Sequence, residues 1–195
     1  MPDKADLKGM LGGLVAALGG RTGIPEGCHA IEGFDVKRYL GRWYEIARLD
    51  HSFERDMTDV TAHYGLREDG GITVINRGFV PAGDEAEKGE ERGGEWDQAE
   101  GRAYFEEAPT RGRLRVSFFG PFYAGYNILM LDEHYQNALV AGPNHGFLWF
   151  LSRTPTLDEA HFEKMRQLAE RSGFDTGALI RLSHARRAHQ PPDPL

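Results

Sequence analysis

The chain has 195 residues, of which 40% are hydrophobic, and its formal net charge is −7. This length and composition predict a single domain with enough apolar residues to form a core. The acidic balance argues against nucleic acid as a partner, because phosphate contacts require clustered basic residues. The single cysteine, Cys28, excludes an internal disulfide bond.

Residues 1–30 are expected to form a mobile leader. The stretch 10–20 is weakly apolar, but it is too short and too rich in glycine to span a bilayer. The residues before it carry no net positive charge, so a signal peptide is not indicated. Cys28 follows a small residue, Gly27, as an acylated cysteine does, but the two residues before Gly27 do not fit that signal. We favour an unmodified thiol, with acylation as the alternative.

The first strand is predicted over residues 43–50, next to the tripeptide Gly41-Arg42-Trp43. Gly41 lets the backbone turn tightly there, and Trp43 is expected to plug the base of a barrel. Arg153 follows the last hydrophobic strand and can lay its guanidinium across the indole as a cation–π lid. The pair predicts a β-domain with a closed floor.

Short strands with alternating polarity follow. The segments 58–66 and 72–79 are predicted to form a hairpin around a turn that contains two glycines. Further strands are predicted at 99–106, 113–119, 125–131, 137–141 and 146–152. Alternation places Ala62, Tyr64 and Leu66 on one face of the second strand, and Leu114, Val116 and Phe118 on the inward face of the fifth. The last three strands are apolar on both faces, which is typical where a helix or a partner covers the outside.

Residues 81–97 interrupt the strands and are predicted to form a solvated loop, because 84–95 contain six acidic and two basic residues. The period changes after Pro155, where Thr156 and Glu159 predict a helix with a capping box. Gly173 is expected to end this amphipathic helix.

A short strand is then predicted at 179–182. The proline-rich, basic tail over 184–195 is expected to be disordered.

These elements predict an all-β fold, an eight-stranded antiparallel up-and-down β-barrel (a calyx) with one C-terminal α-helix packed on the outside. The stretches FDVKRYLGRWYEIARLDHSFER, VSFFGPFYAGYN, LDEHYQNALVAGP and LWFLSRTPTL resemble the lipocalin family. Within it the chain looks very like the bacterial outer-membrane lipoproteins of the Blc type, which are similar to apolipoprotein D. The resemblance covers residues 34–182 and implies a lipocalin domain over 31–183.

The resemblance implies a binding protein that is not an enzyme. Its function would be to bind, store or transport a small hydrophobic ligand, with a fatty acid or a lysophospholipid as the leading candidates and no cofactor or metal. An eight-stranded barrel encloses room for one such ligand. The resemblance also points to the cell envelope, at the outer membrane or in the periplasm, with the cytoplasm as the alternative. Contact with a membrane surface and a homodimer are further partner predictions.

The expected ligand-binding residues come from two sources. Alternation directs Tyr64, Val116 and Phe118 into the barrel. Similarity to apolipoprotein D and retinol-binding protein implies the inward residues of the other strands, which are Val74, Asn76, Tyr126, Ile128, Ala138, Val140, Phe147 and Trp149. The cavity would be walled by aromatic side chains, with Asn76, Tyr64 and Tyr126 to orient the polar head of a ligand. Simple core packing is the alternative for each of them.

Residues 118–123 contain four aromatic side chains at one end of the barrel. Exposed Phe122 and Tyr123 would suit a membrane surface or a partner subunit, but we favour a hydrophobic cap.

Two other functions stay open, a lipocalin-like isomerase or epoxidase acting on a lipid or pigment, and a haem or tetrapyrrole binder. The eight histidines form no HExxH motif and no triad spacing. His51 and Glu54 are expected to be polar residues of the rim. Because Cys28 precedes the first strand, thiol catalysis in the cavity is not expected.

Overall fold

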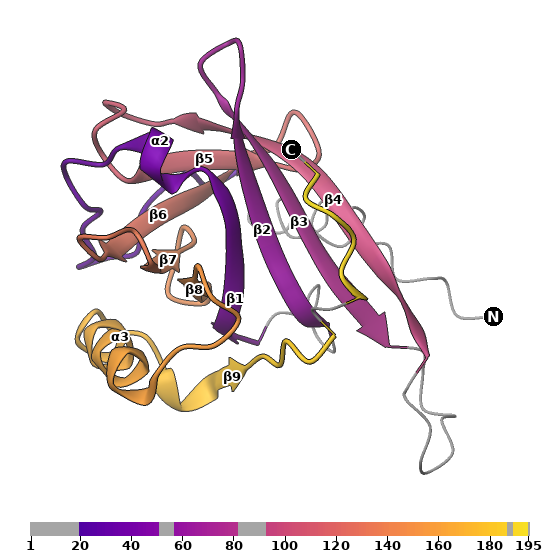
Figure 1. Cartoon of the computed structure of the whole chain (residues 1–195). Helices are drawn as coiled ribbons and strands as arrows, with labels where there is room; N and C mark the ends of the chain where they lie inside the picture. Colours follow the sequence, from indigo (N-terminus) through magenta and orange to yellow (C-terminus); the bar gives the residue numbers. More distant parts are fainter. Residues whose placement is uncertain (1–19, 51–56, 82–92, 187–188, 195) are drawn as a thin grey trace.

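The computed structural model describes residues 20–50, 57–81, 93–186 and 189–194 (Figure 1). Within them the chain forms one antiparallel sheet, whose strands are β1 (Gly41–Leu49), β2 (Thr58–Leu66), β3 (Ile72–Pro81), β4 (Gly94–Phe105), β5 (Arg113–Ser117), β6 (Ala124–Leu131), β7 (Asn137–Ala141), β8 (Leu148–Ser152) and β9 (Leu179–Arg181). Each strand from β2 to β8 pairs with its neighbour in sequence, and β1 closes the barrel by pairing with both β2 and β8. The predicted eight-stranded up-and-down barrel is confirmed, and β9 adds a short strand to β1.

The floor of the barrel is closed where Arg153 lies on Trp43. The Arg153 guanidinium carbon is 4.0 Å from the centre of the indole, which is fully buried. The same guanidinium donates to the carbonyl oxygens of Arg42 at 2.8 Å and Arg38 at 2.9 Å. Gly41 has a φ of +89°, a conformation that glycine adopts without strain. This arrangement joins the end of β8 to the beginning of β1.

The short helix α2 (Val36–Tyr39) completes the floor. The Asp35 side chain caps it by accepting a hydrogen bond from the Lys37 amide at 2.9 Å. The indole nitrogen of Trp43 donates to the Tyr39 carbonyl oxygen at 2.8 Å, which ties the helix to the first strand. The chain therefore crosses the narrow end of the barrel before β1 begins.

The helix α3 (Glu159–Arg171) covers the outside of β7 and β8 (Figure 1). Its buried side chains pack against apolar residues on the outer faces of these strands; the cluster contains Leu139, Leu148, Phe150, Phe162, Met165 and Ala169. This contact explains why both faces of the last strands are apolar. It also removes the reason for which we predicted a homodimer through those faces, because the chain covers them with its own helix.

Two predicted details at the ends of elements are wrong, the residue that caps α3 and the face of β2 on which Leu66 lies. The capping box at Thr156 and Glu159 is not formed, because α3 is capped by Asp158, whose side chain accepts from the His161 amide at 3.0 Å. Its C-terminal end is as predicted, since Gly173 has a φ of +90°. Leu66 does not share the buried face of β2, and it is 55% exposed where that strand leaves the barrel.

The hairpin of β3 and β4 is longer than predicted. Strand pairing continues to Pro81 opposite Gly94, so residues 94–97 belong to β4 and not to a solvated loop. The rings of Phe79 and Trp96 lie across this pair with centroids 5.7 Å apart, and cross-strand aromatic contacts of this kind stabilise a sheet. The rest of the acidic segment, residues 82–92, lies outside the described residues.

The described part of the predicted leader packs on the barrel. The Gly125 amide donates to the Arg21 carbonyl oxygen at 2.9 Å, and the Asn127 side chain donates to that of Gly23 at 2.9 Å. Cys28 is buried, and its sulfur lies 3.5 Å from the Ser172 carbonyl oxygen. Residues 20–30 therefore differ from the mobile segment that we predict.

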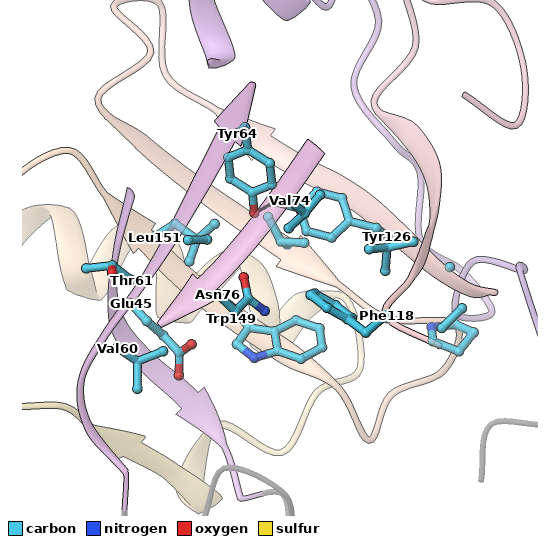
Figure 2. Close-up of a pocket in the computed structure, with 17 residues that line it drawn as sticks. Glu45, Val60, Thr61, Tyr64, Val74, Asn76, Phe118, Tyr126, Trp149 and Leu151 are labelled. Carbon is cyan, nitrogen blue, oxygen red and sulfur yellow. Dashed lines mark hydrogen bonds between the residues drawn. The ribbon is translucent and has the colours of Figure 1, made fainter. Parts of the chain in front are cut away.

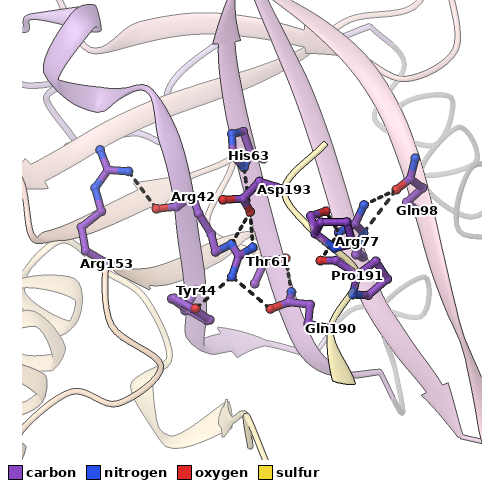
Figure 3. Close-up of polar contacts among 11 residues, drawn as sticks. Arg42, Tyr44, Thr61, His63, Arg77, Gln98, Arg153, Gln190, Pro191 and Asp193 are labelled. Atoms are coloured by element: carbon purple, nitrogen blue, oxygen red, sulfur yellow. Dashed lines mark hydrogen bonds and ion pairs between the residues drawn. The ribbon is translucent and has the colours of Figure 1, made fainter. Parts of the chain in front are cut away.

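The C-terminal segment also differs from the disordered tail that we predict. Its described residues lie across the outer face of β1, β2 and β3 (Figure 3). The side-chain contacts join Arg42 to Asp193, Thr61 to Gln190, and Arg77 to the carbonyl oxygens of Pro191 and Pro192. A proline-rich segment has few backbone donors of its own, but its carbonyl oxygens can accept hydrogen bonds. The outward-facing arginines of the barrel donate these bonds.

Within the described residues, none of the helices has the length and hydrophobicity needed to cross a bilayer.

Replacing Arg153 with lysine is expected to weaken the floor, since an ammonium group cannot stack on Trp43 and bond two carbonyl oxygens in one plane. We expect the free energy of unfolding to fall by about 1–3 kcal/mol. Urea denaturation followed by circular dichroism measures it. Arg115→Lys is the control, because Arg115 is exposed and pairs with Glu106 on the surface. Equal losses in the two variants would contradict the role of Arg153.

Candidate ligand-binding site

The barrel contains a pocket of about 750 Å³, including its open mouth, and its walls are mainly apolar and aromatic (Figure 2). Eight of the eleven side chains predicted to bind a ligand line it, namely Tyr64, Val74, Asn76, Val116, Phe118, Tyr126, Val140 and Trp149. They come from β2, β3, β5, β6, β7 and β8, so opposite walls of the barrel contribute. Alternation along each strand brings these residues to one enclosed space.

Ile128 and Phe147 do not line this pocket. Ile128 is fully buried in the barrel core, close to a register shift between Ile128 and Met130 that interrupts the alternation of β6. Phe147 precedes β8, which begins at Leu148, and its ring stacks on Trp149 with centroids 6.3 Å apart. Ala138 is likewise a buried core residue. All three belong to the apolar core inside the barrel or pack against it.

Several lining residues were not predicted. They include Glu45, Val60, Thr61, Ala62, Gly142, Pro143 and Leu151. Val60 and Ala62 lie on the same face of β2 as Tyr64, because side chains two residues apart in a strand point to the same side. Alternation alone would therefore have predicted that both line the pocket. Glu45 is two residues from the floor residue Trp43, but its charge argued against an inward position.

Three phenol groups form a hydrogen-bonded cluster at the closed end of the pocket. The Tyr126 hydroxyl lies 2.6 Å from that of Tyr39 and 2.7 Å from that of Tyr64. Burial raises the pKa of all three side chains, and those of Tyr39 and Tyr126 rise well above the ordinary value. The hydroxyls are therefore neutral at physiological pH. They carry three protons, of which at least two are used in hydrogen bonds within the cluster.

A charged pair lies in the wall farther toward the mouth. The Glu45 carboxylate accepts a hydrogen bond from the Arg48 guanidinium at 2.9 Å, and the two side chains are 7% and 2% exposed. Burial raises the pKa of Glu45, and the positive charge of Arg48 opposes that rise. A register shift between Glu45 and Ala47 lets residues three apart in β1 meet inside the barrel. Glu45 lines the pocket itself.

The mouth carries two exposed aromatic side chains in the loop between β5 and β6. Phe119 is 58% exposed and Phe122 is 44% exposed, whereas Phe118 points into the pocket. The hydrophobic cap that we favour for this loop is therefore wrong for Phe122. Tyr123 lies beside two arginines, with the guanidinium carbon of Arg115 5.2 Å from its ring centre.

The described residues do not bring together a set of metal-binding side chains. Among the described residues, no three His, Cys, Asp or Glu side chains are placed to hold a metal ion. Cys28 lies outside the barrel beneath α3, and burial raises the pKa of its thiol. His51 and Glu54, which we expect at the rim, lie outside the described residues.

Residues 34–184 match the family model of the lipocalin-like domain. The chain is a lipocalin. It is 53% identical over 156 residues to the outer membrane lipoprotein Blc of Escherichia coli strain K12, covering 80% of this chain and 82% of the relative. The Blc lipoprotein of Vibrio cholerae is 49% identical over 164 residues, covering 84% and 90% of the two chains.

More distant proteins share the same plan. Mouse apolipoprotein D is 34% identical to this lipocalin over 152 residues, covering 74% of each chain. The structure of insecticyanin from the tobacco hornworm Manduca sexta superposes with a TM-score of 0.64 at 16% identity, covering 87% of this chain and 91% of insecticyanin. This last similarity shows the fold alone. The resemblance to Blc-type lipocalins stated from the sequence is confirmed.

The phenol cluster predicts how stability depends on alkaline pH. Because folding raises these pKa values, the folded chain holds more protons than the unfolded chain above pH ~10, so the free energy of unfolding falls as the pH rises there. Below the ordinary tyrosine pKa this contribution is fully present. We expect Tyr126→Phe to reduce the slope above pH ~10 by about 1.4 kcal/mol per pH unit. Urea denaturation at several pH values measures this, and a slope equal to that of the wild type would contradict it.

Proposed function

We propose that this lipocalin binds and carries a single-chain lipid, a fatty acid or a lysophospholipid, in the pocket of the barrel. The observation that carries the proposal is the pocket itself, which is walled by Val74, Val116, Phe118 and Trp149 and closed at one end by hydrogen-bonded phenols. Each methylene group that leaves water for such walls contributes about 0.8 kcal/mol. The few polar groups would orient the ligand without fixing its shape.

A location in the cell envelope is part of the proposal, and it is supported by the relatives that are outer membrane lipoproteins. We propose that Cys28 itself is not acylated. The thiol is buried against the end of α3, so an attached lipid would displace the surrounding core.

We also propose that the loop between β5 and β6 contacts the membrane surface from which the lipid enters. Exposed Phe119 and Phe122 lie beside the pocket residue Phe118, so apolar surface extends from the wall of the pocket to its rim. Aromatic side chains are well suited to the boundary between headgroups and acyl chains. A homodimer stays a prediction, without the support of the outer faces of β7 and β8.

The isomerase, epoxidase and tetrapyrrole alternatives gain no specific support. In the described part of the chain, no histidine or cysteine lines the pocket. The phenols of Tyr39, Tyr64 and Tyr126 are bonded to one another. The arrangement offers apolar contact and hydrogen bonding, which are the requirements of a carrier.

Truncation of Trp149 to alanine tests the carrier function. We expect detergent-free wild-type protein to retain a stoichiometric single-chain lipid in native mass spectrometry, and Trp149→Ala to bind oleate at least about tenfold more weakly, or about 1.4 kcal/mol. Displacement of a fluorescent fatty acid measures the affinity. Leu66→Ala is the control, since Leu66 is apolar but lies outside the pocket. An empty wild-type protein that also fails to bind added lipid would rule the proposal out.

A further inference from the structure

We propose that Glu45 is a specificity-determining residue that selects lipids whose polar group donates hydrogen bonds and disfavours the free carboxylate of a fatty acid. The inference rests on the proposed function, because it assumes that a lipid occupies the pocket. The favoured class is a single-chain lipid with a hydroxyl group next to the chain, as in a monoacylglycerol or the glycerol part of a lysophospholipid.

The Glu45 carboxylate is oriented to meet a ligand. It lines the pocket and lies near Val60 and Trp149 in Figure 2. One of its oxygens accepts the Arg48 hydrogen bond at 2.9 Å. A carboxylate offers about four acceptor positions in total, so acceptor capacity beyond this ion pair remains for a donor in the pocket. Hydroxyl and ammonium groups can occupy that position.

A ligand carboxylate finds no comparable partner. Among the described residues that line the pocket there is no lysine, arginine or histidine. The adjacent cation, Arg48, is already paired with Glu45. Two carboxylates near each other in an apolar site repel strongly, because little water is present to screen them. Specificity arises here from a repulsive contact with the wrong ligand as much as from an attractive contact with the right one.

The closed end of the pocket does not compensate for this repulsion. The hydroxyls of Tyr39, Tyr64 and Tyr126 are neutral, and at least two of their three protons are used within the cluster. Even one remaining hydroxyl donor cannot replace the hydration of a carboxylate. An un-ionised polar group is therefore accepted throughout the pocket, whereas an anion is disfavoured beside Glu45 and poorly solvated at the phenols.

The test compares oleate with 1-oleoylglycerol, which share the same acyl chain. Affinities are measured at pH 8 by displacement of a fluorescent lipid from the wild-type protein, Glu45→Gln and the double variant Glu45→Gln/Arg48→Met. We expect the wild type to bind 1-oleoylglycerol at least about tenfold more tightly than oleate. Glu45→Gln should remove this preference, because the neutral amide no longer repels the carboxylate of oleate. The double variant should bring the two affinities to within about threefold.

The double variant keeps the test decisive if Glu45→Gln alone does not fold, since it removes both buried charges together. Glu106→Gln is the matched control, because Glu106 pairs with Arg115 outside the pocket, and it should leave the wild-type ratio unchanged. A wild type that prefers oleate, or a ratio that the double variant does not alter, would overturn the role of Glu45. Wild-type protein that binds neither lipid would instead contradict the proposed function, and the inference with it.

Discussion

The structure depends on the contact between Arg153 and Trp43, because it closes one end of the barrel. A sheet rolled into a barrel has two open ends, and a pocket with a single entrance requires that one of them be blocked. The guanidinium bonds the carbonyl oxygens of Arg38 and Arg42 and covers the indole, so it joins the end of β8 to α2 and the beginning of β1. Every side chain above this floor is then shielded from water on that side.

Two sets of polar groups inside the barrel bond to one another. The phenols bond to one another, and Glu45 bonds to Arg48. A buried polar group without a partner costs free energy, so self-contained pairs and clusters allow polarity inside an otherwise apolar pocket. This pairing also limits the hydrogen bonds that the pocket can form with a ligand. The phenol cluster has at most one proton to donate, whereas Glu45 can only accept while it is ionised.

Much of the fold and part of the site could be predicted from the sequence. Regular alternation identified Tyr64, Val116 and Phe118, because strands without irregularities obey a period of two. Glu45 was missed because its charge argues against an inward position, although it lies two residues from Trp43. Ile128 was assigned by resemblance, and its side chain lies in the barrel core and not in the wall of the pocket. Cross-strand packing of Trp96 extended β4 into a segment whose composition indicates a loop.

The chain after α3 contacts the backbone of β1 behind Glu45, on the outside of the barrel. The His184 ring nitrogen lies 2.9 Å from the Glu45 carbonyl oxygen, and the Leu182 amide donates to the next carbonyl, that of Ile46. Glu45 is thus held through its backbone on one side of the wall and through Arg48 on the other. A side chain held at both ends cannot easily turn away from an unsuitable ligand. Discrimination by charge requires this rigidity, because a carboxylate free to swing toward solvent would admit the anion that it is placed to exclude.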